Sequence, residues 1–310
     1  TYHTVAIQED GTVRAWGMND YGQCDIPSNL GVCIAIAAGS RHTVALLANG
    51  TVRAWGRNDY GQCNIPADLG VCSAISAGAT SNHTAVLLAN DGTNDTDDNV
   101  RVWGSNSSGQ RLVPVGLGNC KAISVGGDLT LAVRSDGIVV AWGNNRYGQR
   151  TIPVALDACV DIAGGDYHTV VIVQEDNSVR AFGRNDYGQC NIPVGLGPCL
   201  AIACGAYHTL ALRTNGTVVG WGLNTYGQLN VPTSYLLAST LPPFEMPAQD
   251  GTDTVPHLAI DPISEFVDET IFNYLPSVSD IGSINDYWVV YPHPNTIINK
   301  DTTDILGFVD

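Results

Sequence analysis

The stretch Gly56–Pro66 reads GRNDYGQCNIP, and the same eleven residues recur without a difference at Gly183–Pro193, 127 positions further along. Around both copies, an aromatic residue followed by glycine recurs at spacings of 39, 48, 39, 40 and 39 residues. These dipeptides begin at Trp16, Trp55, Trp103, Trp142, Phe182 and Trp221. A period of this length is the signature of an internal repeat. The duplicated stretch is therefore one register of a unit that occurs six times.

One unit contains several short strand signals. CIAIAAG, which begins at Cys33, is a continuous apolar run typical of a buried strand. HTVALLANGTVRAWG, which begins at His42, is two strand-like runs around Asn49-Gly50, a dipeptide that favours a two-residue hairpin turn. A sheet this small buries both faces only by packing against neighbouring units. We predict an all-β fold, a β-propeller with six short blades, or seven if the C-terminal segment contributes one.

The repeat pattern AIAAG-x-x-H-T-V-A-L…G-T-V-x-A-W-G-x-N-x-Y-G-Q…P resembles the repeats of the regulator of chromosome condensation family. The 39-residue unit is similar to the short-blade form of that family, such as the propeller-type β-lactamase inhibitory protein. The resemblance covers residues 1–235 and implies a propeller, but a fold does not imply the family's nucleotide-exchange activity. Because the chain starts inside a repeat, the first blade lacks its opening strand. Either residues 233–240, TSYLLAST, return to supply it or upstream residues do.

The charge balance excludes several partners. The chain has 14 basic and 30 acidic residues, a net charge of −16, which disfavours binding to nucleic acid and to anionic membranes. No apolar run of 18 residues exists, so we expect no membrane insertion. The sequence contains no P-loop, no G-x-S-x-G and no C-x-x-C motif, and we predict neither an enzyme nor a cofactor.

Histidines and tryptophans recur in phase with the repeat. The histidines are His3, His42, His83, His168 and His208, and Leu129 takes this position in the fourth unit. Each histidine falls in a different blade without close ligand spacing, so we expect imidazoles bonded to backbone within each blade rather than a metal site. The tryptophans of the repeat are predicted to pack between blades.

Tyrosines form the candidate binding face. One repeat phase becomes a ring on one face of a propeller, and tyrosine is a favoured contact residue. The tyrosines that precede Gly-Gln are Tyr21, Tyr60, Tyr147, Tyr187 and Tyr226, and the third unit has Ser108. The alternative is that these rings only pack the loops.

Eight of the nine cysteines occupy two phases nine residues apart, which gives three candidate disulfides. The pairs are Cys24–Cys33, Cys63–Cys72 and Cys190–Cys199. The third and fourth units have Arg111 and Arg150 at the upstream position. Three disulfides imply an oxidising compartment. The alternative is that the cysteines are small buried apolar residues at strand starts.

A nine-residue insertion in the third unit is acidic. We place it at 90–99, NDGTNDTDDN, where Asp91, Asp95 and Asp97 alternate as carboxylates do in calcium-binding loops. The glycine and glutamate that complete such a loop are absent, which favours a solvated hairpin tip over a calcium site.

Residues 236–310 do not follow the repeat pattern. This segment holds eight of the 15 prolines, three of the 34 glycines, and 12 acidic residues against one lysine. It also contains apolar stretches that a disordered tail would not need, including Tyr287, Trp288 and Tyr291. We interpret it as an arm that docks on a protein partner or a neighbouring subunit; alternatively it wraps its own propeller.

These observations predict a non-enzymatic binding or structural protein, displayed on an extracellular or virion surface and attached through the C-terminal arm. The GQC-x-IP…LGVC pattern resembles repeat proteins of marine bacteria and their phages. This resemblance implies a tail, fibre or decoration protein that recognises a cell-surface receptor or glycan of the host. The alternative is a soluble inhibitor or adhesin that binds a protein through one propeller face.

Overall fold

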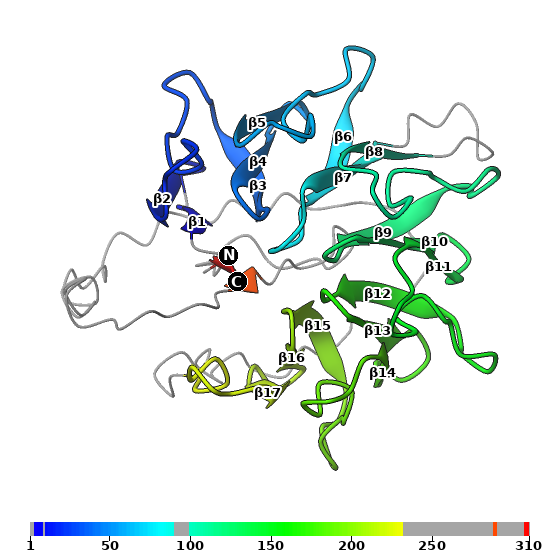
Figure 1. Cartoon of the computed structure of the whole chain (residues 1–310). Helices are drawn as coiled ribbons and strands as arrows, with labels where there is room; N and C mark the ends of the chain where they lie inside the picture. Colours follow the sequence, from blue (N-terminus) through cyan, green and yellow to red (C-terminus); the bar gives the residue numbers. More distant parts are fainter. Residues whose placement is uncertain (1–2, 9, 90–98, 232–287, 290–306, 310) are drawn as a thin grey trace, which may run out of the picture. The chain divides into compact units, whose positions relative to one another are not determined.

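The computed structural model describes residues 3–8, 10–89, 99–231, 288–289 and 307–309, which form strands and turns without a helix. Most strands belong to six small antiparallel sheets, which we number blades 1 to 6 in chain order (Figure 1). Blade 1 contains β1 (His3–Ile7) and β2 (Val13–Gly17); blade 2 contains β3 (Cys33–Ala38), β4 (His42–Leu47) and β5 (Val52–Gly56); blade 3 contains β6 (Cys72–Ser76), β7 (His83–Leu88) and β8 (Val100–Gly104); blade 4 contains β9 (Cys120–Val125), β10 (Leu129–Arg134) and β11 (Val139–Gly143); blade 5 contains β12 (Cys159–Gly164), β13 (His168–Val173) and β14 (Val179–Gly183); and blade 6 contains β15 (Cys199–Cys204), β16 (His208–Arg213) and β17 (Val218–Gly222).

Each three-stranded blade has an inner, a middle and an outer strand in chain order. The inner strands β3, β6, β9, β12 and β15 contact one another in succession, so the sheets follow one another around an axis as in a propeller. The predicted all-β propeller with six blades is therefore confirmed.

Blade 1 lacks an inner strand among the described residues, as the sequence predicted. A separate pair, β18 (Trp288–Val289) and β19 (Gly307–Val309), has β19 in contact with β1 and β18 in contact with β15. Residues 233–240, proposed to complete blade 1, lie outside the described residues.

The predicted hairpins join the middle and outer strands, but their turns are one residue longer than expected. In blade 2, the Leu47 N–H donates to Thr51 O and the Gly50 N–H donates to Leu47 O, so Ala48, Asn49 and Gly50 form a three-residue turn. Gly50 has a φ of +78°, the conformation that such a turn requires at its last position. In blade 5, Asn177 with a φ of +54° takes the place of this glycine.

The nine extra residues of the third unit do not form a single insertion. The inner and middle strands begin nine residues apart in blades 2, 4, 5 and 6, but eleven residues apart in blade 3. Two of the nine residues therefore lie in the loop before β7, where the Ser81 hydroxyl hydrogen-bonds to His83 Nδ1 at 2.7 Å. The remaining seven lie between β7 and β8, in the part that includes residues 90–98, outside the described residues.

The apolar core lies between the blades rather than within them. Each of the five main apolar clusters joins two consecutive blades. Between blades 2 and 3, for example, Val44 and Leu46 pack with Val86 and Trp103. Each aliphatic side chain buried in this way stabilises the fold by about 1.5–3 kcal/mol. One blade alone would expose these surfaces, so the fold depends on stacking of the repeats.

A buried histidine–threonine hydrogen bond crosses each of four blade junctions. His42 Nε2 in blade 2 lies 3.0 Å from Thr84 Oγ1 in blade 3, and Thr84 Oγ1 donates to the main-chain oxygen of Gln62. Because the threonine proton is used on that carbonyl, the imidazole must donate from Nε2, which assigns the neutral tautomer with its proton there. The other histidine–threonine pairs are His3–Thr43, His83–Thr130 and His168–Thr209. The expected backbone partner within the same blade is thus corrected to a side chain of the next blade.

The tryptophans pack between blades, as predicted. The indoles of Trp55, Trp103 and Trp221 donate from Nε1 to the same glutamine main-chain oxygens that the threonines use. Trp16 is the exception, with 51% of its surface exposed.

Acid should unfold this protein by protonating the buried histidines. Burial lowers the pKa of His3 to about 4 and those of His42, His83 and His168 to about 3, whereas an unfolded histidine titrates near 6.5. The unfolded chain binds more protons between these values, so this stability is complete above about pH 6.5 and is lost as the pH falls towards 4. We predict that His42→Leu has a shallower dependence of unfolding free energy on pH between 6.5 and 4 than the unmodified protein, measured by urea denaturation. Equal slopes would contradict the buried neutral state.

Candidate functional site

Two sets of loops leave every blade at the same end. Strand register pairs His42, which begins the middle strand, with Gly56, which ends the outer strand, and the other blades repeat this pairing. The loop before the middle strand and the loop after the outer strand therefore meet at one end of each sheet. This end carries the candidate tyrosines.

The loop after each outer strand is held rigidly by its own side chains. In blade 2, Gln62 Oε1 accepts the Tyr60 N–H at 2.9 Å, and Asn58 Oδ1 accepts the Cys63 N–H at 2.9 Å. The same pair of bonds recurs in all six loops, including the third, where Ser108 replaces tyrosine. Each tyrosine backbone is thus fixed before any partner arrives, which lowers the entropy cost of binding.

The structure brings four of the five predicted tyrosines to the surface. Tyr21, Tyr60, Tyr187 and Tyr226 are between 41% and 52% exposed, whereas Tyr147 is half-buried. They do not form an even ring, because their neighbours differ from blade to blade.

A continuous arc of rings spans the loops of blades 4 to 6. Tyr147 meets Tyr167 edge-on with centroids 5.2 Å apart, Tyr167 lies 5.4 Å from Tyr207, and Tyr207 lies 5.1 Å from Tyr187. Aromatic pairs in these geometries attract one another beyond their buried area. Burial, Asp166 and Tyr207 together raise the pKa of Tyr167 to about 12, so its phenol stays protonated as a hydrogen-bond donor.

Arginines lie over these rings. The Arg184 guanidinium is 4.8 Å from the Tyr147 centroid and 5.4 Å from those of Tyr167 and Tyr207, and its Nε donates to Asp186 at 2.6 Å. Over blades 1 and 2, Arg57 contacts Tyr21 and Tyr60 in the same way. We call this surface the tyrosine face, made of Tyr21, Arg41, Arg57, Tyr60, Tyr147, Tyr167, Arg184, Tyr187, Tyr207 and Tyr226.

Sequence reasoning missed Tyr167, Tyr207 and the arginines. Tyr167 and Tyr207 directly precede the in-phase histidines, so the Tyr-His-Thr tripeptides were the available signal. The position is tyrosine in blade 1 as well, at Tyr2, but Arg41, Asn82 and Asp128 take it in blades 2, 3 and 4, so no ring of tyrosines was evident there.

The loops between the inner and middle strands, which carry Arg41, Tyr167 and Tyr207, pack closely against one another. Gly126 and Gly165 lie so close to the carbonyl oxygens of Gly165 and Gly205 on the next blade that a Cβ would not fit. Thr80 of blade 3 donates to Asp166 of blade 5 across the loop of blade 4. Close packing of main chain against main chain leaves these loops little freedom.

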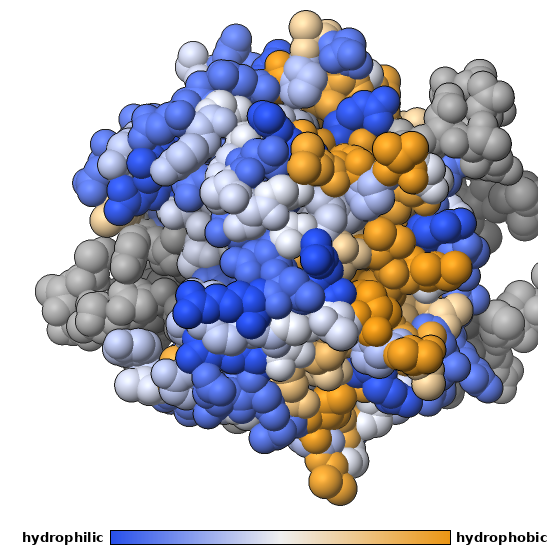
Figure 2. Space-filling model, turned by 45° about the vertical axis from the view of Figure 1, so that its right-hand side comes forward, coloured by the Kyte–Doolittle hydropathy of each residue, from blue (hydrophilic) through white to orange (hydrophobic). Residues whose placement is uncertain are grey.

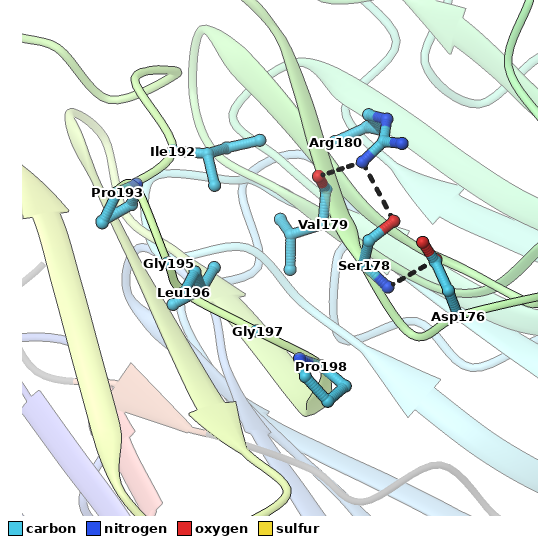
Figure 3. Close-up of a pocket in the computed structure, with 10 residues that line it drawn as sticks. All are labelled: Asp176, Ser178, Val179, Arg180, Ile192, Pro193, Gly195, Leu196, Gly197 and Pro198. Atoms are coloured by element: carbon cyan, nitrogen blue, oxygen red, sulfur yellow. Dashed lines mark hydrogen bonds between the residues drawn. The ribbon is translucent and has the colours of Figure 1, made fainter.

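A shallow pocket lies elsewhere, at the hairpin end of blade 5. It has a volume of about 320 Å³ and is bounded by the start of β14 and by residues 192–198 (Figure 3). Asp176 Oδ1 accepts the Ser178 N–H, and Arg180 donates to Ser178 Oγ and Val179 O. The polar groups that line the pocket thus bond to one another.

The outer rim exposes apolar side chains. Val115, Val154 and Val194, at equivalent positions of three loops, are completely exposed, and Leu112 is 65% exposed. Figure 2 shows apolar surface running through a largely hydrophilic side of the molecule. These side chains have no polar group of their own that could orient a ligand.

The cysteines do not form the three proposed disulfides, because none of the nine is disulfide-bonded in the structure. Cys63 Sγ donates to Arg57 O at 3.3 Å and Cys72 Sγ lies 3.9 Å from Gly70 O, so members of a proposed pair point to different carbonyls. The same holds for Cys24–Cys33 and Cys190–Cys199. Burial raises the pKa values of Cys63, Cys72 and Cys190 to about 11, which keeps these thiols protonated and poorly reactive.

The other candidates fall outside what the structure describes. Asp91, Asp95, Asp97, Tyr287 and Tyr291 lie outside the described residues, and only the backbone of Trp288 is described. Among the described residues, no group of three His, Cys, Asp or Glu side chains could hold a metal. No helix in that part of the chain could cross a membrane.

Comparison with known proteins supports this architecture. The regulator of chromosome condensation (RCC1) repeat model matches residues 1–23, 33–62, 120–149, 159–189 and 200–228. No curated protein matches the chain.

Several solved structures share the fold at low identity. Prp20p from Saccharomyces cerevisiae, reported with its binding to Gsp1p and histones, is 21% identical with a TM-score of 0.57, covering 71% of this chain and 70% of its own. The receptor kinase CR4 ectodomain from Physcomitrella patens is 20% identical with a TM-score of 0.61, covering 78% and 72%. Human WBSCR16 is 20% identical with a TM-score of 0.60, covering 74% and 77%. Identities this low show the fold alone.

Proposed function

Since this chain is an RCC1-type repeat β-propeller, we propose that it is a non-enzymatic binding protein whose tyrosine face contacts a protein partner. The observation that carries the proposal is the arc of four tyrosine rings around Arg184 on rigid loops. Tyrosine and arginine are enriched among the residues that dominate binding energy at protein interfaces. Prp20p, which shares the fold, is reported to bind Gsp1p and histones, and this supports a protein as the class of partner.

The arginines of the tyrosine face are paired with aspartates, so we expect the partner to be recognised through short-range contacts rather than long-range electrostatic attraction. Arg57 and Arg184 each pair with an aspartate at 2.6 Å, and their side chains are 23% and 21% exposed. A guanidinium neutralised in this way adds little net charge to the surface. Binding through the face should therefore depend only modestly on salt.

We also propose a location for the protein and a means of attachment. Residues 236–310, with 12 acidic residues, one lysine and eight prolines, differ sharply in composition from the repeats. We propose that they attach the chain to a neighbouring subunit on an extracellular or virion surface, so that the propeller is displayed for host recognition. The same face serves a soluble inhibitor or adhesin; attachment through 236–310 is what distinguishes display from that alternative.

Removing the exposed rings should abolish partner binding without unfolding the chain. We predict that the full chain with Tyr21, Tyr60, Tyr187 and Tyr226 changed to alanine loses the protein captured by the unmodified chain from extracts of its source, measured by quantitative mass spectrometry. The control changes Val115, Val154 and Val194 to serine, which removes exposed side chains from the rim instead, and should keep the partner. Equal capture by both variants would contradict binding through the face, provided that their melting temperatures match.

Display should make the propeller accessible on intact particles or cells. An antibody against the Asn49-Gly50 hairpin should label intact source particles or cells by immunogold electron microscopy. If label appears only after lysis, the surface proposal fails, whereas binding through the tyrosine face would be unaffected by that result.

A further inference from the structure

The two identical loops place the same three side chains at two points on the tyrosine face. Arg57, Asp59 and Tyr60 follow β5 in blade 2, and Arg184, Asp186 and Tyr187 follow β14 in blade 5. Blades 3 and 4 lie between them (Figure 1). We call the two groups the blade 2 triplet and the blade 5 triplet.

The arginine–aspartate pairs of the two triplets have the same geometry, although Arg57 also lies over Tyr60 whereas Tyr187 packs against Tyr207. In both, the arginine Nε lies 2.6 Å from an aspartate Oδ2, and the aspartate side chain is the more exposed partner, at 60% and 63%. Each arginine also lies over the tyrosine of the preceding loop, Arg57 at 5.2 Å from Tyr21 and Arg184 at 4.8 Å from Tyr147. Tyr60 and Tyr187 are similarly exposed, at 52% and 47%.

The fold does not require this identity. The third and fourth loops carry Ser105-Asn106-Ser107-Ser108 and Asn144-Asn145-Arg146-Tyr147 at the same positions. Their asparagines and glutamines nevertheless make the same backbone bonds. Asparagine, glycine and glutamine therefore specify the turn, and the arginine, aspartate and exposed tyrosine are free to vary. In the described loops, only blades 2 and 5 combine all three.

We propose that the triplets are two copies of one binding epitope and that the protein partner carries the matching element twice, as a repeat or as two identical subunits. The inference rests on the proposed function, because it assumes that the tyrosine face binds. Identical side chains around the same arginine–aspartate pair select the same chemical element. Occupying both sites with linked elements raises the effective concentration of the second, commonly strengthening binding by about 10²–10⁴-fold.

The residues that surround the two triplets differ, so the two sites are similar but not identical. Near the blade 2 triplet, Arg41 Nη1 donates to the Tyr21 hydroxyl at 3.0 Å, whereas near the blade 5 triplet Tyr167 and Tyr207 extend the aromatic arc. The shared triplet sets which element binds, and the added rings of blade 5 strengthen its contact. We therefore expect two sites of the same specificity, with blade 5 the tighter.

Stoichiometry tests this inference with a defined probe. Cyclic peptides are selected by phage display on the full chain and counter-selected on the Tyr60→Ala, Tyr187→Ala double variant. The monomeric peptide should bind with two sites per chain by calorimetry, and Tyr60→Ala and Tyr187→Ala should each remove one site. The control is Val154→Ser, which removes a fully exposed side chain of the loop after blade 4 that is not part of the tyrosine face, and should leave two sites.

A tandem peptide gives the second readout. Two copies joined by a linker of suitable length should bind about 100-fold tighter than one copy, and either single variant should abolish the gain. A stoichiometry of one, lost with one tyrosine and unaffected by the other, would overturn the two-epitope inference while leaving the proposed function intact. If no selected peptide is sensitive to the double variant, the proposed function itself fails.

Discussion

The main-chain oxygen of one glutamine in each inter-blade loop joins the core of this protein to its surface. Gln62 O accepts the hydroxyl of Thr84 and the indole of Trp103, both from the next blade. The side chain of the same glutamine accepts the Tyr60 backbone N–H. Leaving a buried donor of this kind unpaired costs about 1–3 kcal/mol, so each junction has one strongly preferred arrangement. The tyrosine loops are therefore placed by the same residue that locks neighbouring blades together.

The repeat made most of the fold predictable. Spacing of the aromatic–glycine pairs located every described outer strand, and apolar runs located the inner strands. The hairpin turns were one residue too short in the prediction, because Asn-Gly serves both two-residue turns and longer turns that end in glycine at positive φ. The insertion was misplaced in part, since a spacing between tryptophans cannot say which loop within the unit holds extra residues.

The interactions between blades were the least predictable. A histidine in phase with the repeat needs a partner when buried, but its sequence does not say that the partner is a threonine one blade further on. Tyr167 and Tyr207 escaped notice because their position is variable, and only the structure shows that they join Tyr147 and Tyr187 into an arc. The cysteine spacing suggested cross-links, whereas the thiols of each pair face different carbonyls. Such facts depend on contacts between units, which a pattern within one unit does not encode.

The neutral Nε2-protonated tautomer of the junction histidines tests this account most directly. Long-range ¹H–¹⁵N correlation spectra of the full chain report which imidazole nitrogen carries the proton. The account predicts that His3, His42, His83 and His168 show a protonated Nε2 and an unprotonated Nδ1 at neutral pH, and that they do not titrate near 6.5. Protonation at Nδ1, or an ordinary titration of these four rings, would contradict the hydrogen-bond chain that holds the blades and their loops in place.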